Sequence, residues 1–125
     1  MKVRRLDHLV LTVASLEATV DFYTRVLGMT VRAFEGGRLA LRFGEQKINL
    51  HEAGQEFEPK ARVAAPGTGD LCFAVEGPLD AWLAHLEELG VPVTEGPVPR
   101  TGALGPMTSV YVRDPDGNLI EIGSY

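Results

Sequence analysis

The chain has 125 residues, of which 45% are hydrophobic and 23% are charged, a composition typical of one globular domain and not of a disordered segment. Its formal charge of -5 argues against a nucleic-acid partner, because phosphate binding needs a clustered positive surface. No apolar run is long enough for a membrane span or a signal peptide, and the single cysteine, Cys72, cannot form an internal disulfide. We therefore expect a cytoplasmic protein without a membrane partner.

The first half of the chain predicts a strand, a helix and three further strands. The strand DHLVLTV covers residues 7–13, and the helix begins near Ser15 and ends at Gly28, with apolar residues at helical spacing between them. Three more strands are predicted from the segments TVRAFE (30–35), RLALRF (38–43) and KINLHE (47–52).

A stretch rich in small, charged and turn-forming residues, 54–69, predicts a linker. After it the same order of elements returns: a strand DLCFAV (70–75), a helix opened by Gly77-Pro78 and ended by Gly90, and strands PVTE, TSVYVR and NLIEIG. The glycines and prolines of EGPVPRTGALGP, 95–106, predict an irregular loop.

The two halves align as an internal repeat. His8 and Asp70 are 62 positions apart, as are the two helix-ending glycines. With an offset of 70 in the last hairpin, the turns GEQK and DPDG correspond and His51 falls on Glu121. The sequence thus predicts an α+β fold of two tandem βαβββ modules, with module 1 at about 1–53 and module 2 at about 70–125, in one domain spanning 1–125.

The repeat pairs four side chains that can bind a metal: His8 with Asp70, and His51 with Glu121. Two imidazoles with carboxylates suit a divalent transition metal such as iron, nickel, manganese, cobalt or zinc. A histidine in an apolar strand is more often a core histidine satisfied by one hydrogen bond, and this alternative for His51 stays open.

The segments DHLVLTVASLEATVDFYTRVLGM, KINLHE and VYVRDPDGNLIEI resemble signature segments of the vicinal oxygen chelate superfamily. This superfamily includes glyoxalase I, extradiol dioxygenases and the fosfomycin and bleomycin resistance proteins. The resemblance covers nearly the whole chain. Within the superfamily, the chain is most similar to glyoxalase domain-containing proteins and to bacterial virulence-related members. It implies two βαβββ modules that form an incomplete barrel around a divalent metal, often across a homodimer.

Three positions match the ligand pattern that this resemblance implies: His8, His51 and Glu121. At the fourth, where glyoxalases and extradiol dioxygenases have histidine, this chain has Asp70, which would be a fourth ligand or a nearby catalytic proton acceptor. Tyr111 matches a position where fosfomycin-resistance relatives place a substrate-binding tyrosine, although a strand tyrosine is commonly part of the core. Arg100 would bind an anionic substrate or would simply be a solvated loop residue.

These observations together predict a metal-dependent enzyme of the glyoxalase or dioxygenase type. Its substrate would be a small molecule that chelates the metal through two adjacent oxygens. The alternative is a protein of the bleomycin-resistance kind, which binds and sequesters a small molecule without chemistry. We also expect a homodimer, because each half-barrel leaves one sheet face to be covered.

Overall fold

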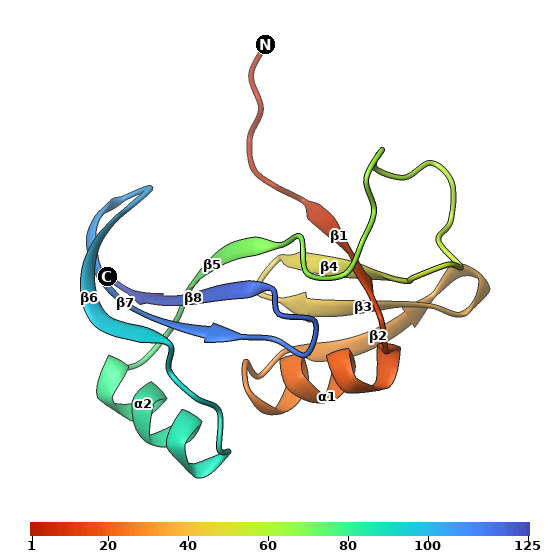
Figure 1. The fold of residues 1–125 in the computed structure, drawn as a ribbon. Helices are drawn as coiled ribbons and strands as arrows, with labels where there is room; N and C mark the ends of the chain where they lie inside the picture. Colours follow the sequence, from red (N-terminus) through yellow and green to blue (C-terminus); the bar gives the residue numbers. More distant parts are fainter. The chain divides into compact units, whose positions relative to one another are not determined.

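The computed structural model describes all 125 residues, which divide into two compact units, Met1–Thr68 and Gly69–Tyr125. The first unit consists of β1 (His8–Val13), α1 (Leu16–Arg25), β2 (Thr30–Phe34), a short 3-10 helix (Glu35–Gly37), β3 (Arg38–Phe43) and β4 (Gln46–Glu52) (Figure 1). The second consists of β5 (Asp70–Ala74), α2 (Leu79–Glu88), β6 (Glu95–Gly102), β7 (Gly105–Arg113) and β8 (Leu119–Ser124). The α+β class and the two βαβββ modules predicted from the sequence are confirmed.

Both units have the same sheet topology. The strand order is β1-β4-β3-β2 in the first sheet and β5-β8-β7-β6 in the second. In each, the first strand of the module pairs in parallel with the last, and the remaining pairs are antiparallel. Each sheet has two free edges, so neither is a closed barrel by itself.

Local sequence signals explain where α1 begins and why the chain turns after it. The Ser15 side chain accepts a hydrogen bond from the backbone N–H of Ala18 at 3.1 Å, which satisfies one of the first unpaired amides of the helix. Gly28 follows with φ of 70°, a left-handed conformation that glycine adopts without steric cost. Neither helix is long and apolar enough to cross a membrane.

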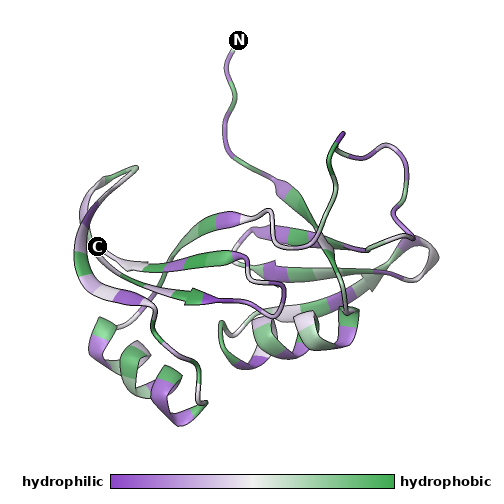
Figure 2. Cartoon of the chain, viewed as in Figure 1, coloured by the Kyte–Doolittle hydropathy of each residue, from purple (hydrophilic) through white to green (hydrophobic).

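Hydrophobic and hydrophilic residues are interspersed along the strands (Figure 2). Because successive side chains point to opposite faces of a strand, each sheet has one apolar face. In the first unit that face contributes Leu11, Val13, Leu41, Ile48 and Leu50, all buried, and α1 lies along it with buried Phe22 and Tyr23 (Figure 1). In the second unit the apolar face contributes the buried residues Val110, Val112, Ile120 and Ile122, and Leu86 of α2 is also buried. The opposite face of each sheet carries the polar residues that concern function.

The loop predicted for 95–106 is wrong. Glu95–Gly102 form β6, which pairs with β7, and of the predicted strand PVTE only Glu95 belongs to a strand. Proline is tolerated here because β6 is an edge strand bonded on one side only. The pairing is irregular between Glu95 and Val98, where Gly96 has a φ of 104°. Glycine and proline therefore marked an irregular edge strand and not a loop.

Candidate functional site

Strand pairing places the candidate residues of the first unit on the polar face of its sheet. His8 pairs with Lys47, Val10 with Asn49 and Thr12 with His51. Directly paired residues point to the same face, so this face carries both histidines. Their positions differ by four residues along the strands, however, which corresponds to a separation of about 13 Å.

His8 lies at the start of β1 and is half exposed. Its Nδ1 lies 2.8 Å from Oδ1 of Asp7, and this hydrogen bond lowers the pKa of the Asp7 carboxyl. A carboxylate bonded to one ring nitrogen orients the imidazole and leaves the other nitrogen, Nε2, for a ligand.

His51 is buried, with 7% of its surface exposed. Its ring packs edge-on against Phe57, with centroids 5.6 Å apart. Its Nδ1 is buried and has no hydrogen-bond partner. A core histidine satisfied by a hydrogen bond at this atom is thus not what the structure contains, since buried ring nitrogens are normally paired.

The pairing register changes the correspondence between the modules. In the first sheet Asn49 lies opposite Val10, and in the second Glu121 lies opposite Cys72. Val10 and Cys72 are themselves 62 positions apart, so the residue equivalent to Glu121 is Asn49 and not His51. The last hairpins account for one of the two positions of this shift, since eight residues lie between paired Ala40 and Asn49 and nine lie between paired Tyr111 and Glu121. Asn49 also has a buried Oδ1 without a hydrogen-bond partner.

Glu121 occupies the centre of β8, on the polar face of the second sheet. The buried Ser109 hydroxyl on β7 donates a hydrogen bond to its Oε2 at 2.7 Å, which fixes the carboxylate. Asp70 begins β5, pairs with Leu119 and is exposed. Two residues further on, dehydration and the Glu121 carboxylate raise the pKa of the Cys72 thiol to about 11, so this thiol is protonated at neutral pH.

Tyr111 and Arg100 lie together beside Glu121. Tyr111 is directly opposite Glu121 in the register, and Arg100 Nε donates a hydrogen bond to the Tyr111 hydroxyl at 2.8 Å. That bond raises the pKa of Arg100, while dehydration raises the pKa of Tyr111 although the guanidinium opposes it. Arg100 also lies 3.5 Å from Glu95. The second unit therefore contains a connected group of residues, Glu121, Ser109, Tyr111 and Arg100, on one face.

The chemistry of these donors fits a divalent metal, since two imidazoles and two carboxylates lie on polar sheet faces and His51 Nδ1 is a buried nitrogen without a partner. The structure contains no group of three or more histidine, cysteine, aspartate or glutamate side chains close enough to hold an ion. His8 and Asp70 begin their strands, and Asn49 and Glu121 lie one diagonal step from them. Each unit by itself thus offers an equivalent pair of positions.

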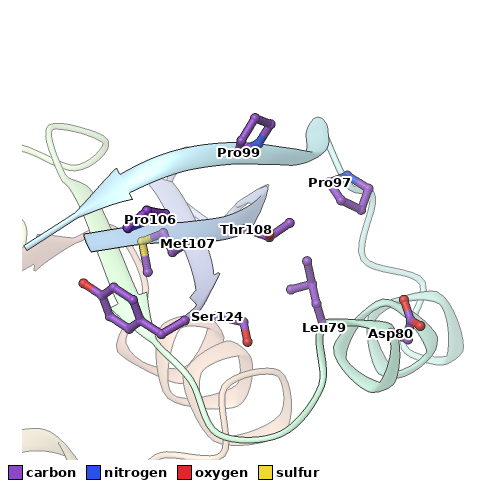
Figure 3. Close-up of a pocket in the computed structure, with 9 residues that line it drawn as sticks. Leu79, Asp80, Pro97, Pro99, Pro106, Met107, Thr108 and Ser124 are labelled. Carbon is purple, nitrogen blue, oxygen red and sulfur yellow. The ribbon is translucent and has the colours of Figure 1, made fainter. Parts of the chain in front are cut away.

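A separate hollow of about 490 Å³ lies in the second unit between the start of α2 and the β6–β7 hairpin (Figure 3). The hollow is lined by Pro97, Pro99, Pro106 and Met107 on the strand side and by Leu79 and Asp80 on the helix side. It contains none of the predicted metal ligands and is largely apolar.

Two residues of the site were missed by the sequence reasoning. No pattern in the sequence indicates a functional role for Ser109, because its hydrogen bond to Glu121 depends on the pairing of β7 with β8. Asn49 does give one: it lies two positions from His51 and so shares its face, in a strand whose alternate positions are apolar.

Comparison with known proteins agrees with this fold and topology. Residues 5–122 match the family model described as the Glyoxalase/Bleomycin resistance protein/Dioxygenase superfamily. The chain is 58% identical to glyoxalase domain-containing protein RDO1 of Mycosarcoma maydis, over 100% of this chain and 70% of that protein. It is 50% identical to virulence protein STM3117 of Salmonella typhimurium, over 100% of this chain and 87% of that protein. The crystal structure of STM3117 has a TM-score of 0.98 and is covered to 99%.

A more distant solved structure is the lactoylglutathione lyase from Agrobacterium tumefaciens. It is 26% identical, with a TM-score of 0.75, over 99% of this chain and 96% of that chain. The family model covers most of the chain, and the close relatives cover all of it. This chain therefore belongs to the glyoxalase/bleomycin resistance protein/dioxygenase superfamily.

Proposed function

We propose that this protein is a metal-dependent enzyme of the glyoxalase or dioxygenase type. Its substrate is a small molecule with two adjacent oxygens, and its cofactor is one divalent ion of iron, nickel, manganese, cobalt or zinc. The proposed ligands are His8, His51 and Glu121, and Asn49, which lies one diagonal step from His8, is the alternative to His51. The observation that carries the proposal is the buried Nδ1 of His51, which has no partner in the chain and lies on the polar face that also bears His8.

The surrounding residues have roles that follow from their contacts. Ser109 donates a hydrogen bond to Oε2 of Glu121 and so fixes the position of the carboxylate. Asp7 orients the His8 ring. Asp70, an exposed carboxylate on the same face as Glu121, accepts a proton from the substrate. A bound divalent ion would supply Lewis-acid stabilisation of negative charge developing on the substrate oxygens.

Tyr111 and Arg100 are proposed to bind the substrate. The Arg100 guanidinium donates through Nε to Tyr111, and the side chain is 38% exposed, which leaves N–H groups for a ligand. The hydroxyl of Tyr111 is held at a defined position by this bond. Together they present a cation and a phenol next to Glu121.

The metal content of untagged protein, purified without chelator and measured by elemental mass spectrometry, tests the proposal. Wild type is expected to contain one transition metal per chain, and His51→Ala to lose it. His85→Ala is the matched control, because His85 lies on α2 and packs against Trp82. Iron would indicate oxygenation, and nickel or zinc would indicate isomerisation or addition. Equal metal content in wild type and His51→Ala would contradict the ligand assignment.

Asn49→Ala, measured in the same experiment, separates two ligand sets. Loss of metal in His51→Ala alone supports the set with two histidines. Loss of metal in Asn49→Ala alone would mean that Asn49, the equivalent of Glu121 in the strand register, is the ligand and that His51 is not.

A binding protein without chemistry is the second candidate, and the apolar hollow of about 490 Å³ favours it (Figure 3). An apolar cavity of this size suits a small hydrophobic ligand. Metal-free protein that takes up no metal on titration, yet binds an apolar fluorescent probe less tightly after Met107→Glu, would support this function over the enzyme.

A further inference from the structure

The charge of the chain is distributed unevenly between its two units. Residues 1–68 contain ten of the twelve lysines and arginines and eight of the seventeen acidic residues, a formal charge of +2. Residues 69–125 have a formal charge of -7. An acidic protein thus has one basic half.

Four of these cations lie on the polar face of the first sheet. The register places Arg42 between Lys47 and Thr30, Arg32 opposite Ala40, and Arg38 next to Phe34. No aspartate or glutamate occurs among the strand residues of this face, which are His8, Val10, Thr12, Thr30, Arg32, Phe34, Arg38, Ala40, Arg42, Lys47, Asn49 and His51. The face is therefore positive without internal neutralisation.

Two of the four cations already have aromatic contacts. The Arg38 guanidinium lies 4.0 Å from the centre of the Phe57 ring, and Lys47 Nζ lies 4.2 Å from the centre of the Phe34 ring. Arg32 and Arg42 have neither an aromatic contact nor a salt bridge. Both are exposed.

Arg32 and Arg42 also share a hollow. They are diagonal neighbours across the β2–β3 pair, so their backbones are about 7–8 Å apart. Both line a hollow of about 300 Å³, together with Gly28, Thr30, Phe43 and Gly44. Two unpaired like charges at this distance repel each other, and an anion between them removes the repulsion.

We propose that Arg32 and Arg42 bind an oxyanion group, a carboxylate or a phosphate, of a small-molecule ligand. The planar guanidinium matches such groups through two parallel N–H donors. This inference rests on the proposed function and narrows its substrate class to anionic molecules that carry adjacent oxygens.

Titration of metal-free protein with inorganic phosphate and, separately, with acetate at low ionic strength tests the proposal. Amide chemical shifts are expected to change saturably within residues 28–44. Arg32→Gln and Arg42→Gln are each expected to weaken binding at least tenfold, since each removes one of two cations. Arg62→Gln removes the same charge from the linker and should change the affinity less than twofold. The probe that binds more tightly identifies the preferred oxyanion.

Unchanged anion binding in the Arg32→Gln/Arg42→Gln double variant would overturn the proposal. Amide chemical-shift changes confined to residues outside 28–44 would also overturn it. Arg32→Lys/Arg42→Lys keeps the charge and removes the paired donors, so intermediate affinity is expected. Because the protein is metal-free, failure of anion binding leaves the metal-content experiment unaffected. Absence of metal in that experiment likewise leaves the anion titration valid, so the two proposals fail separately.

Discussion

Asn49 and His51 each have a buried side-chain polar atom that lacks a hydrogen bond, a property that they share with Thr19 of α1. A buried amide oxygen without a partner costs about 1–3 kcal/mol of stability. Such a cost is commonly retained where the atom binds something that is not part of the chain. The two residues alternate with Ile48 and Leu50, whose burial holds β4 in place.

Replacing Asn49 by leucine is expected to stabilise the metal-free protein by about 1 kcal/mol, because the unpaired amide oxygen is removed with little change of volume. Urea denaturation followed by circular dichroism measures the change. The neighbouring Lys47→Leu has no buried unpaired atom to remove and serves as the control. A destabilised Asn49→Leu protein would mean that the amide has a structural partner.

Ser109→Ala removes a hydrogen bond to a carboxylate at a fully buried position. We expect a loss of about 1–2 kcal/mol in unfolding free energy. If Glu121 binds the metal, affinity for the metal should also fall by about 10- to 100-fold, as is typical when a residue that orients a ligand is lost. Ser124→Ala, on the strand β8 that also carries Glu121, should leave the unfolding free energy and the metal affinity nearly unchanged. An unchanged metal affinity in Ser109→Ala would contradict the assignment of Glu121 as a metal ligand.

At the scale of elements, the turn 114–118 is held by hydrogen bonds of the Asp114 and Asn118 side chains. Asp114 Oδ1 accepts from the backbone amides of Asp116 and Asn118 at 2.9 Å, and its Oδ2 accepts from Asn118 Nδ2 at 2.7 Å. Asn118 Oδ1 in turn accepts from the amide of Gly69 at 2.7 Å, which joins the turn to the residue before β5. The DPDG segment quoted above for its resemblance thus has a structural role.

Asn118→Ala is expected to lower the unfolding free energy by about 2–4 kcal/mol, since it leaves the buried Asp114 carboxylate and the Gly69 amide each short of a partner. Thermal denaturation monitored by circular dichroism would show the loss. Glu45→Ala, in the corresponding turn of the first unit, should change stability by less than about 0.5 kcal/mol because its side chain is exposed.

The segment that follows β4 contains a local ion pair with a testable pH dependence. Lys60 Nζ donates to Glu56 Oε1 at 3.0 Å, and this bond, with a further one from the Gly54 amide, lowers the pKa of Glu56 below 4.5. A lowered folded-state pKa stabilises this segment above pH 4.5, and the stabilisation is lost as the pH falls through the folded-state pKa.

Lys60→Ala should therefore raise the pKa of Glu56 toward its ordinary value. The carboxyl carbon chemical shift of Glu56, followed by NMR between pH 2 and 7, measures it. Lys2→Ala is the control with the same charge change. An unchanged Glu56 pKa in Lys60→Ala would show that the ion pair does not persist in solution.

At the scale of the whole molecule, the polar sheet faces remain partly exposed in the single chain. Asp70, Cys72 and Ala74 are exposed along β5, and His8 and Val10 along β1. Faces of this kind are usually covered by another element or by another copy.

We therefore expect a homodimer. Sedimentation equilibrium at micromolar concentration should give about twice the 13.5 kDa mass of the chain. A mass of one chain across that concentration range would contradict the expectation.

The sequence by itself determined the elements and their repeat. Alternation and helical spacing placed nine of the ten strands and α-helices, all except β6, because these signals depend only on neighbouring residues. The resemblance carried by DHLVLTV, KINLHE and NLIEI was sufficient to identify the superfamily, which the family comparison confirms. The boundary signals Ser15, Gly28 and Gly90 also lie where the helices begin or are followed by a turn.

Only the tertiary structure decided the register of the strands. Strand pairing makes Asn49, and not His51, the equivalent of Glu121, and no local pattern in the sequence indicates that pairing. The same holds for β6, whose prolines are compatible with a strand because it lies at a sheet edge. The contacts of Ser109 with Glu121 and of Arg100 with Tyr111 likewise join residues on different strands, as does the hollow that Arg32 and Arg42 line. Register, edge position and cross-strand contact are properties of pairing between distant segments, so the chain must fold before they exist.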